Sequence, residues 1–95
     1  QIPLDPATGK LVETSFGQRV YQVMHNLEAI LQEAGSDFSK VIKTTIFVTD
    51  LENYAELNKI YGEFFAGDQA PARSAIQFAG LPLGTDVEIE MIAYK

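Results

Sequence analysis

The apolar side chains return at two different periods along the chain. Between residues 15 and 35 they recur every three or four positions, which predicts an amphipathic helix. Its expected buried stripe consists of Val20, Met24, Leu27, Ile30, Leu31 and Ala34. Thr14 or Ser15 is expected to begin this helix, since Ser15 and Gln18 have capping-box spacing, and Gly35 is expected to end it.

A second pair of elements follows. Residues 41–48 are dominated by β-branched side chains, which predicts a strand. Capping residues at 50–53 then precede a second helical stripe that should end near Gly67. This stripe consists of Leu57, Ile60, Tyr61, Phe64 and Phe65, and its aromatic members, like Tyr54, are interpreted as core.

Beyond Pro71 the pattern predicts strands over 73–79 and 86–93, joined by a loop at 80–84. Strict alternation in the last strand places Asp86, Glu88 and Glu90 on one face. The preceding strand is expected to carry Arg73, Ala75, Gln77 and Ala79 on that same face. The predicted fold class is α+β, with two helices packed on one face of a mixed β-sheet in a single domain over residues 1–95.

Charge and composition narrow the range of functions. The chain has 7 basic and 13 acidic residues, a net charge of −6, which opposes binding to nucleic acid and to anionic membranes. It contains no cysteine, which excludes disulfides and thiolate metal sites. His25, the only histidine, is expected to face solvent, and no metal site is expected around it. We expect a cytoplasmic protein with neither a nucleic-acid nor a membrane partner.

Several short motifs spread over the chain occur together in one known family. They are Gln1-Ile2-Pro3-Leu4-Asp5-Pro6-Ala7-Thr8-Gly9, Lys43-Thr44-Thr45, Thr49-Asp50, Asn58-x-x-Tyr61-x-x-Phe64-Phe65, Pro71-Ala72-Arg73-Ser74, and Val87-Glu88-Ile89-Glu90. In this order and spacing the chain resembles the reactive-intermediate deaminases, the Rid or YjgF-type enamine and imine deaminases. Its Pro-Ala-Arg-Ser element is similar to that of the RidA branch.

The resemblance implies a chorismate-mutase-like (YjgF-type) fold and a homotrimer with active sites between subunits. It also implies hydrolytic deamination of 2-enamine and 2-imine intermediates, such as 2-aminoacrylate, to 2-keto acids and ammonia without a metal or organic cofactor. The expected activity is that of a 2-iminobutanoate/2-iminopropanoate deaminase in metabolite damage control. By position, Arg73 would bind the substrate carboxylate, Glu88 would position the attacking water, and Asn58 would line the cleft.

These roles suit the residue types, but alternatives remain for each. A guanidinium matches a carboxylate with two parallel hydrogen bonds, and a carboxylate can orient and deprotonate water. Arg73 could instead be a structural ion-pair partner, Asn58 a plain polar helix residue, and Glu90 competes with Glu88. A non-catalytic member that binds small carboxylates or a protein partner is the second functional hypothesis, and a translation inhibitor with ribonuclease activity is the third.

The chain departs from the family at two places. Family chains are longer at the N-terminus, where the additional residues supply two strands and a cleft tyrosine. Gln1-Ile2-Pro3-Leu4 itself is expected to be the end of a strand that enters a turn. Ala75 occupies a position where many RidA-type members have a cysteine, so no thiol can contribute there.

Overall fold

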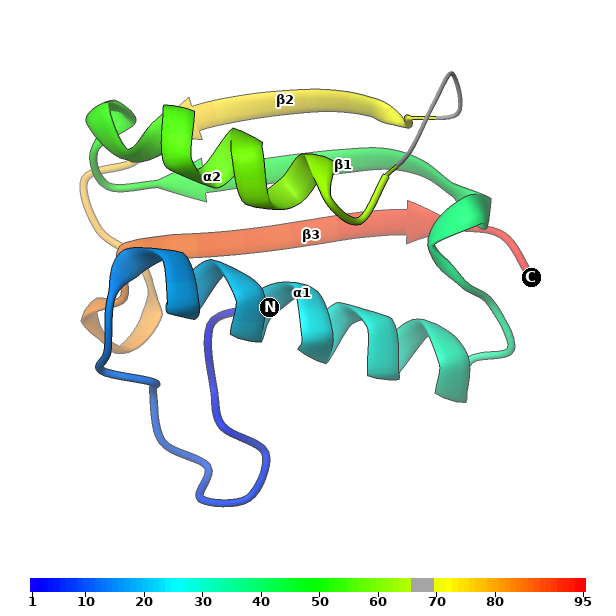
Figure 1. The fold of residues 1–95 in the computed structure, drawn as a ribbon, viewed down its shortest axis with the longest axis horizontal. Helices are drawn as coiled ribbons and strands as arrows, with labels where there is room; N and C mark the ends of the chain where they lie inside the picture. The colour runs from blue at the N-terminus through cyan, green and yellow to red at the C-terminus, as the bar shows by residue number, and fades with distance from the viewer. Residues whose placement is uncertain (66–69) are drawn as a thin grey trace.

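Two helices cover one face of a three-stranded mixed sheet (Figure 1). The computed structural model describes residues 1–65 and 70–95. The strand order is β2-β1-β3, in which β1 (Val41–Val48) is parallel to β2 (Ala72–Gln77) and antiparallel to β3 (Val87–Ala93). The helices α1 (Phe16–Glu33) and α2 (Tyr54–Gly62) lie side by side on this sheet. This arrangement confirms the predicted α+β fold class.

The first helix has the predicted ends. The Ser15 side chain accepts a hydrogen bond from the backbone N–H of Gln18, and Gly35 follows the helix with a φ of 81°, where glycine is favoured. The prediction that Ile30 and Ala34 are buried is wrong, because the Ile30 side chain is 49% exposed and Ala34, the C-cap residue, is also exposed. Ile30 instead lines a shallow cavity with Leu4 of the N-terminal segment, so it lies on the flank of α1 and outside the core.

The second helix begins as predicted, directly after the capping residues at 50–53, but ends earlier than predicted. Asp50 caps a short 3-10 turn (Leu51–Asn53) by accepting a hydrogen bond from the N–H of Glu52, and α2 starts directly after this turn. The helix ends at Gly62, before the predicted end, and Gly67 itself lies outside the described residues. The last two residues of the predicted apolar stripe, Phe64 and Phe65, nevertheless pack against the core, from the turn that follows the helix.

The core lies between the two helices and the sheet. The strands contribute four apolar side chains that have no exposed surface, namely Ile46 and Val48 of β1 and Val87 and Ile89 of β3. The helices contribute Val20, Val23, Met24, Leu27, Leu57, Ile60 and Tyr61. Burial of these apolar groups is the main force that holds the helices on this face of the sheet.

The orientation of β2 is the main correction to the predicted fold. Arg73 pairs in register with Thr44 and Ala75 with Ile46, and these β1 side chains are buried under the helices. Paired residues of neighbouring strands share a face, so Arg73 and Ala75 lie on the helix side, opposite to the predicted face. As an edge strand, β2 can carry a polar residue there because the helices only partly cover it.

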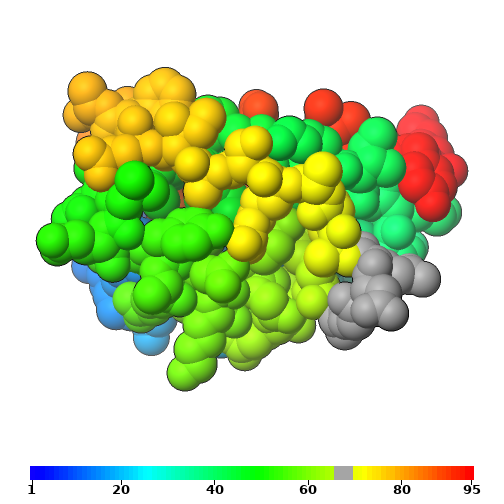
Figure 2. Space-filling model, turned by 90° about the horizontal axis from the view of Figure 1, so that it is seen from above, coloured from blue at the N-terminus to red at the C-terminus, as the bar shows by residue number. Residues whose placement is uncertain are grey.

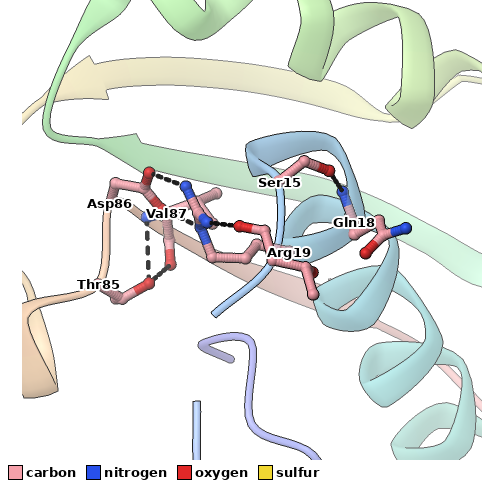
Figure 3. Close-up of polar contacts among 7 residues, drawn as sticks. Ser15, Gln18, Arg19, Thr85, Asp86 and Val87 are labelled. Carbon is pink, nitrogen blue, oxygen red and sulfur yellow. Dashed lines mark hydrogen bonds and ion pairs between the residues drawn. The ribbon is translucent and has the colours of Figure 1, made fainter. Parts of the chain in front are cut away.

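Two contacts anchor the ends of the elements. Arg19 on α1 donates from Nε and Nη2 to the Asp86 carboxylate, at 3.0 and 2.6 Å, which ties the start of α1 to the start of β3 (Figure 3). The backbone of Gln1 exchanges two hydrogen bonds with that of Ile89 at the free edge of β3. Gln1 thus pairs with β3 as a residue of an antiparallel strand does, whereas Leu4 forms only an isolated bridge with Leu11; the interpretation of Gln1 to Leu4 as a strand end stays a prediction.

Candidate functional site

Arg73 is the centre of the candidate site. It lies on β2, the edge strand of the sheet, and is exposed. Figure 2 looks onto this edge, where β2 (yellow) runs along α2 (green) at the surface of the molecule. Because Arg73 points to the helix side, its guanidinium reaches across the gap between the edge strand and α2.

One face of α2 receives this guanidinium. Arg73 donates from Nη1 to Oδ1 of Asn58 at 2.6 Å and from Nη2 to the hydroxyl of Tyr54 at 2.9 Å. The Arg73 Cζ also lies 4.9 Å from the ring centroid of Tyr61, within cation–π distance. Tyr54, Asn58 and Tyr61 are spaced four and three residues apart, which places them on one side of a helix. We call these three residues the Arg73 cradle.

The cradle holds the charge of Arg73 without neutralising it. A hydroxyl, an amide oxygen and an aromatic ring are all uncharged acceptors, and within residues 1–65 and 70–95 no carboxylate forms an ion pair with Arg73. Arg19 is the opposite case, because both of its fork nitrogens are occupied by Asp86. Of the two arginines, Arg73 is the one whose contacts within the described residues are all with uncharged groups, an arrangement that suits the binding of an anion.

Tyr61 connects the cradle to the core. The residue is 4% exposed, and its hydroxyl donates a hydrogen bond to Oγ1 of the buried Thr44 at 3.1 Å. Burial raises the pKa of Tyr61, although the bond to Thr44 and the charge of Arg73 act in the opposite direction. The ring therefore stays neutral at physiological pH, and it remains a cation–π partner rather than an ion pair.

A shallow cavity of about 420 Å³ opens beside the guanidinium. Its lining residues are Asn58, Tyr61, Gly62, Phe65, Ala70, Pro71 and Arg73. The volume falls in the range of small-molecule sites, and the lining combines one cation with aromatic and aliphatic surface. This arrangement suits a small carboxylate that carries an apolar substituent.

The two candidate carboxylates lie on the other face of the sheet. Val87 and Ile89 are fully buried under the helices, so Glu88 and Glu90 point to the uncovered face. Glu88 is half-buried opposite Phe47, and Glu90 is exposed opposite Thr45. A single chain therefore brings Arg73 and Asn58 together but leaves Glu88 on the opposite side of the sheet.

The sequence interpretation missed the role of two tyrosines. It assigned Tyr54 and Tyr61 to the core, which is correct for the burial of Tyr61 but omits its contact with Arg73. Tyr54 is only half-buried and binds Arg73 through its hydroxyl. The available signal was the spacing of Tyr54, Asn58 and Tyr61, which puts two polar groups and an aromatic ring on one helix face.

The remaining candidate features carry less chemistry. Within the described residues, no group of three or more metal-ligating side chains comes together. His25 is exposed on α1, as predicted, 4.0 Å from Glu28. In the described part of the chain, no helix has the length and apolar character required to cross a bilayer.

Comparisons with known proteins agree with this fold. A family model described as Endoribonuclease L-PSP matches residues 1–95. The chain is 43% identical over 95 residues to a 2-iminobutanoate/2-iminopropanoate deaminase of Rattus norvegicus, covering 100% of this chain and 70% of the relative. It is 47% identical over 93 residues to the protein DfrA of Myxococcus xanthus, covering 98% and 70%.

Solved structures show the same arrangement of elements. The crystal structure of RidA from the Antarctic bacterium Psychrobacter sp. PAMC 21119 superposes with a TM-score of 0.94 at 39% identity, covering 100% of this chain and 76% of that one. A Rid-family protein of Yersinia pestis, YyfA, gives a TM-score of 0.94 at 45% identity, covering 98% and 74%. The predicted YjgF-type fold is thereby confirmed.

Proposed function

The chain belongs to the Endoribonuclease L-PSP family, as its resemblance to the Rid proteins predicted, and on this premise we propose that it hydrolyses reactive 2-enamines and 2-imines to 2-keto acids and ammonia. The proposed substrates include 2-aminoacrylate and 2-iminobutanoate. The observation that carries the proposal is the exposed guanidinium of Arg73, which three neutral groups of α2 hold beside a small cavity.

Arg73 would bind the carboxylate that all such substrates share. Its guanidinium has five N–H groups, and its contacts with α2 use two of them, which leaves three for a ligand. Hydrogen bonds between charged groups contribute about 1.5–3 kcal/mol each to the binding free energy. Two parallel bonds from the guanidinium would therefore bind a small carboxylate measurably. Asn58 would line the cleft and orient Arg73 through its Oδ1.

Glu88 would position and activate the water. After an enamine tautomerises to the imine, the water oxygen bonds to the carbon of the C=N group while the Glu88 carboxylate accepts a proton from that water. The carboxyl group returns the proton to the nitrogen of the resulting carbinolamine. The carbinolamine hydroxyl then passes its proton through the same carboxylate to the nitrogen, its oxygen forms the C=O bond as the C–N bond breaks, and ammonia leaves the 2-keto acid behind. The balance requires only water as co-reactant, so we propose no metal or organic cofactor.

The opposite orientations of Arg73 and Glu88 favour a site shared between copies. One chain cannot present both side chains to one small molecule, because the sheet separates them. The uncovered face also carries exposed apolar side chains, among them Ile76 at 44% and Ile92 at 59%, and such a patch favours association. We therefore propose the homotrimer that the resemblance implies, in which neighbouring subunits supply Arg73 and Glu88 to one site. We also propose that the protein acts in the cytoplasm.

The proposal is tested by the release of 2-keto acid from 2-iminobutanoate generated in situ. Arg73→Ala should lower kcat/KM about 100-fold or more, because two charge-assisted hydrogen bonds are lost. Glu88→Gln should lower kcat by about 10²–10⁴-fold, the usual contribution of a general base, and Glu90→Gln should lower it far less. Lys59→Ala is the matched control, since it removes an exposed cation of α2 outside the cradle.

Three outcomes would contradict the proposal. Wild-type protein that does not accelerate 2-keto acid release above buffer would exclude the deaminase activity. Binding of the keto acid without turnover would favour a non-catalytic carboxylate-binding protein. Cleavage of RNA without deamination would favour the activity in the family description, which the net charge of −6 opposes.

A further inference from the structure

Tyr54 and Tyr61 are the two residues of the Arg73 cradle to which the sequence interpretation assigned no part in the site, and of these two Tyr54 forms the hydrogen bond with Arg73. It is the first residue of α2, and its hydroxyl accepts the hydrogen bond from Nη2 of Arg73. Its ring centroid lies 5.6 Å from the Arg73 Cζ. We propose that Tyr54 is a positioning residue that fixes the orientation of the Arg73 guanidinium for a carboxylate ligand; this inference rests on the function proposed above.

A restraint is needed because of where Arg73 lies. The side chain is exposed on an edge strand, and an unrestrained arginine loses rotamer entropy when a ligand orders it. The bond to Asn58 holds Nη1 only. A second bond, from Nη2 to Tyr54, fixes the plane of the guanidinium, so that the ordering occurs before the ligand arrives.

A tyrosine hydroxyl is better suited than a carboxylate to restrain the Arg73 guanidinium. A carboxylate at this place would orient Arg73 but would also compete with the substrate for it, as Asp86 does at Arg19. The phenol hydroxyl accepts a hydrogen bond and leaves the positive charge available. Tyr54 does not line the cavity beside Arg73, which agrees with a role exerted through Arg73 and not on the substrate itself.

The experiment compares Tyr54→Phe and Tyr54→Leu with wild-type protein, and uses Tyr94→Phe, an exposed tyrosine outside the site, as the control. KM and kcat are measured with 2-iminobutanoate generated in situ, and the Kd of 2-oxobutanoate is measured by calorimetry. Tyr54→Phe should raise KM and Kd about three- to tenfold and leave kcat within about twofold, because only the ordering of Arg73 is lost. Tyr54→Leu, which also loses the ring, should raise both further.

The outcomes separate this inference from the proposed function. An active wild type whose KM and Kd do not change in Tyr54→Phe would overturn the positioning role and leave the deaminase function intact. A fall in kcat with unchanged KM would also overturn it, since it would place Tyr54 in the chemical step. If the wild-type protein binds 2-oxobutanoate without turnover, the proposed function is refuted. If the Tyr54→Phe variant then binds 2-oxobutanoate more weakly than the wild type does, the positioning role is supported. A wild type that neither binds nor reacts would refute both.

Discussion

The contact between Tyr61 and Thr44 links the candidate site to the protein core. The ring of Tyr61 contacts Arg73, and its hydroxyl binds Thr44. Tyr61 and Thr44 are both buried. A buried hydroxyl that loses its partner costs about 1–3 kcal/mol, whereas removal of both hydroxyls can be almost neutral. The bond therefore specifies where the ring lies more than it adds to stability.

A double-mutant cycle tests this contact. Thr44→Val and Tyr61→Phe should each lower the free energy of unfolding by about 1–2 kcal/mol, because each leaves one buried hydroxyl without a partner. The double variant should be less destabilised than the sum of the two by about 1 kcal/mol. Urea unfolding followed by circular dichroism measures all four proteins. Strictly additive losses would mean that the two hydroxyls do not interact in solution.

The site residues were predictable from the sequence to different degrees. Arg73 and Asn58 were predicted because they stand in motifs that resemble a known family; the structure brings their side chains together, and their roles in binding stay predictions. Glu88 was found in the same way, and its role stays a prediction because one chain does not bring it near Arg73. Tyr54 was missed because an aromatic residue at the start of an amphipathic helix is usually core, and its hydroxyl acquires a role only once β2 is placed beside α2.

The packing of α2 against α1 fixes where the cradle lies relative to β2. Gly17 of α1 is buried at this helix contact, and a Cβ added there would lie 2.8 Å from Oε2 of Glu56 and 3.3 Å from Cδ1 of Ile60. Helices approach closely only where a small residue permits it. Gly17 thus leaves room for the side chains of Glu56 and Ile60 at this helix contact, and we expect a larger residue there to shift α2 and the cradle that it carries.

Enlarging this residue should disturb both stability and substrate binding. Gly17→Leu is expected to lower the free energy of unfolding by about 1–3 kcal/mol, because the added side chain pushes the helices apart. It should also raise KM, since the cradle moves away from Arg73. Gly80→Leu is the matched control, because a Cβ there meets nothing within 4 Å and Gly80 lies outside the cavity beside Arg73. A Gly17→Leu protein with unchanged Tm and KM would show that the helix spacing does not position the site.

The elements themselves were predicted unevenly. The strand over Val41–Val48 and the start of α1 were confirmed because β-branched runs and capping residues are strong local signals. The end of α2 and the facing of β2 were wrong because they depend on tertiary context. The alternation in β2 predicted that Ala75 lies on the uncovered face of the sheet and Ile76 on the helix side. The register with β1 instead places Ala75 on the helix side and leaves Ile76 on the uncovered face, 44% exposed.

At the scale of the whole molecule, the sheet divides the proposed machinery. The helix side holds Arg73 in its cradle, and the uncovered side holds Glu88 beside Phe47. Exposed apolar side chains on that uncovered side favour contact with another copy. If both residues act on one substrate, the unit of activity is an assembly in which each site takes Arg73 from one subunit and Glu88 from its neighbour.

Mixing two inactive variants tests this central claim most directly. Arg73→Ala and Glu88→Gln subunits are co-expressed in equal amounts, and the release of 2-keto acid from 2-iminobutanoate is compared with wild type. Random assembly puts an intact Arg73 and an intact Glu88 at about one quarter of the sites between subunits, so about a quarter of the wild-type rate should return. A mixture that stays as inactive as either variant alone, although mass spectrometry shows mixed oligomers, would contradict the account.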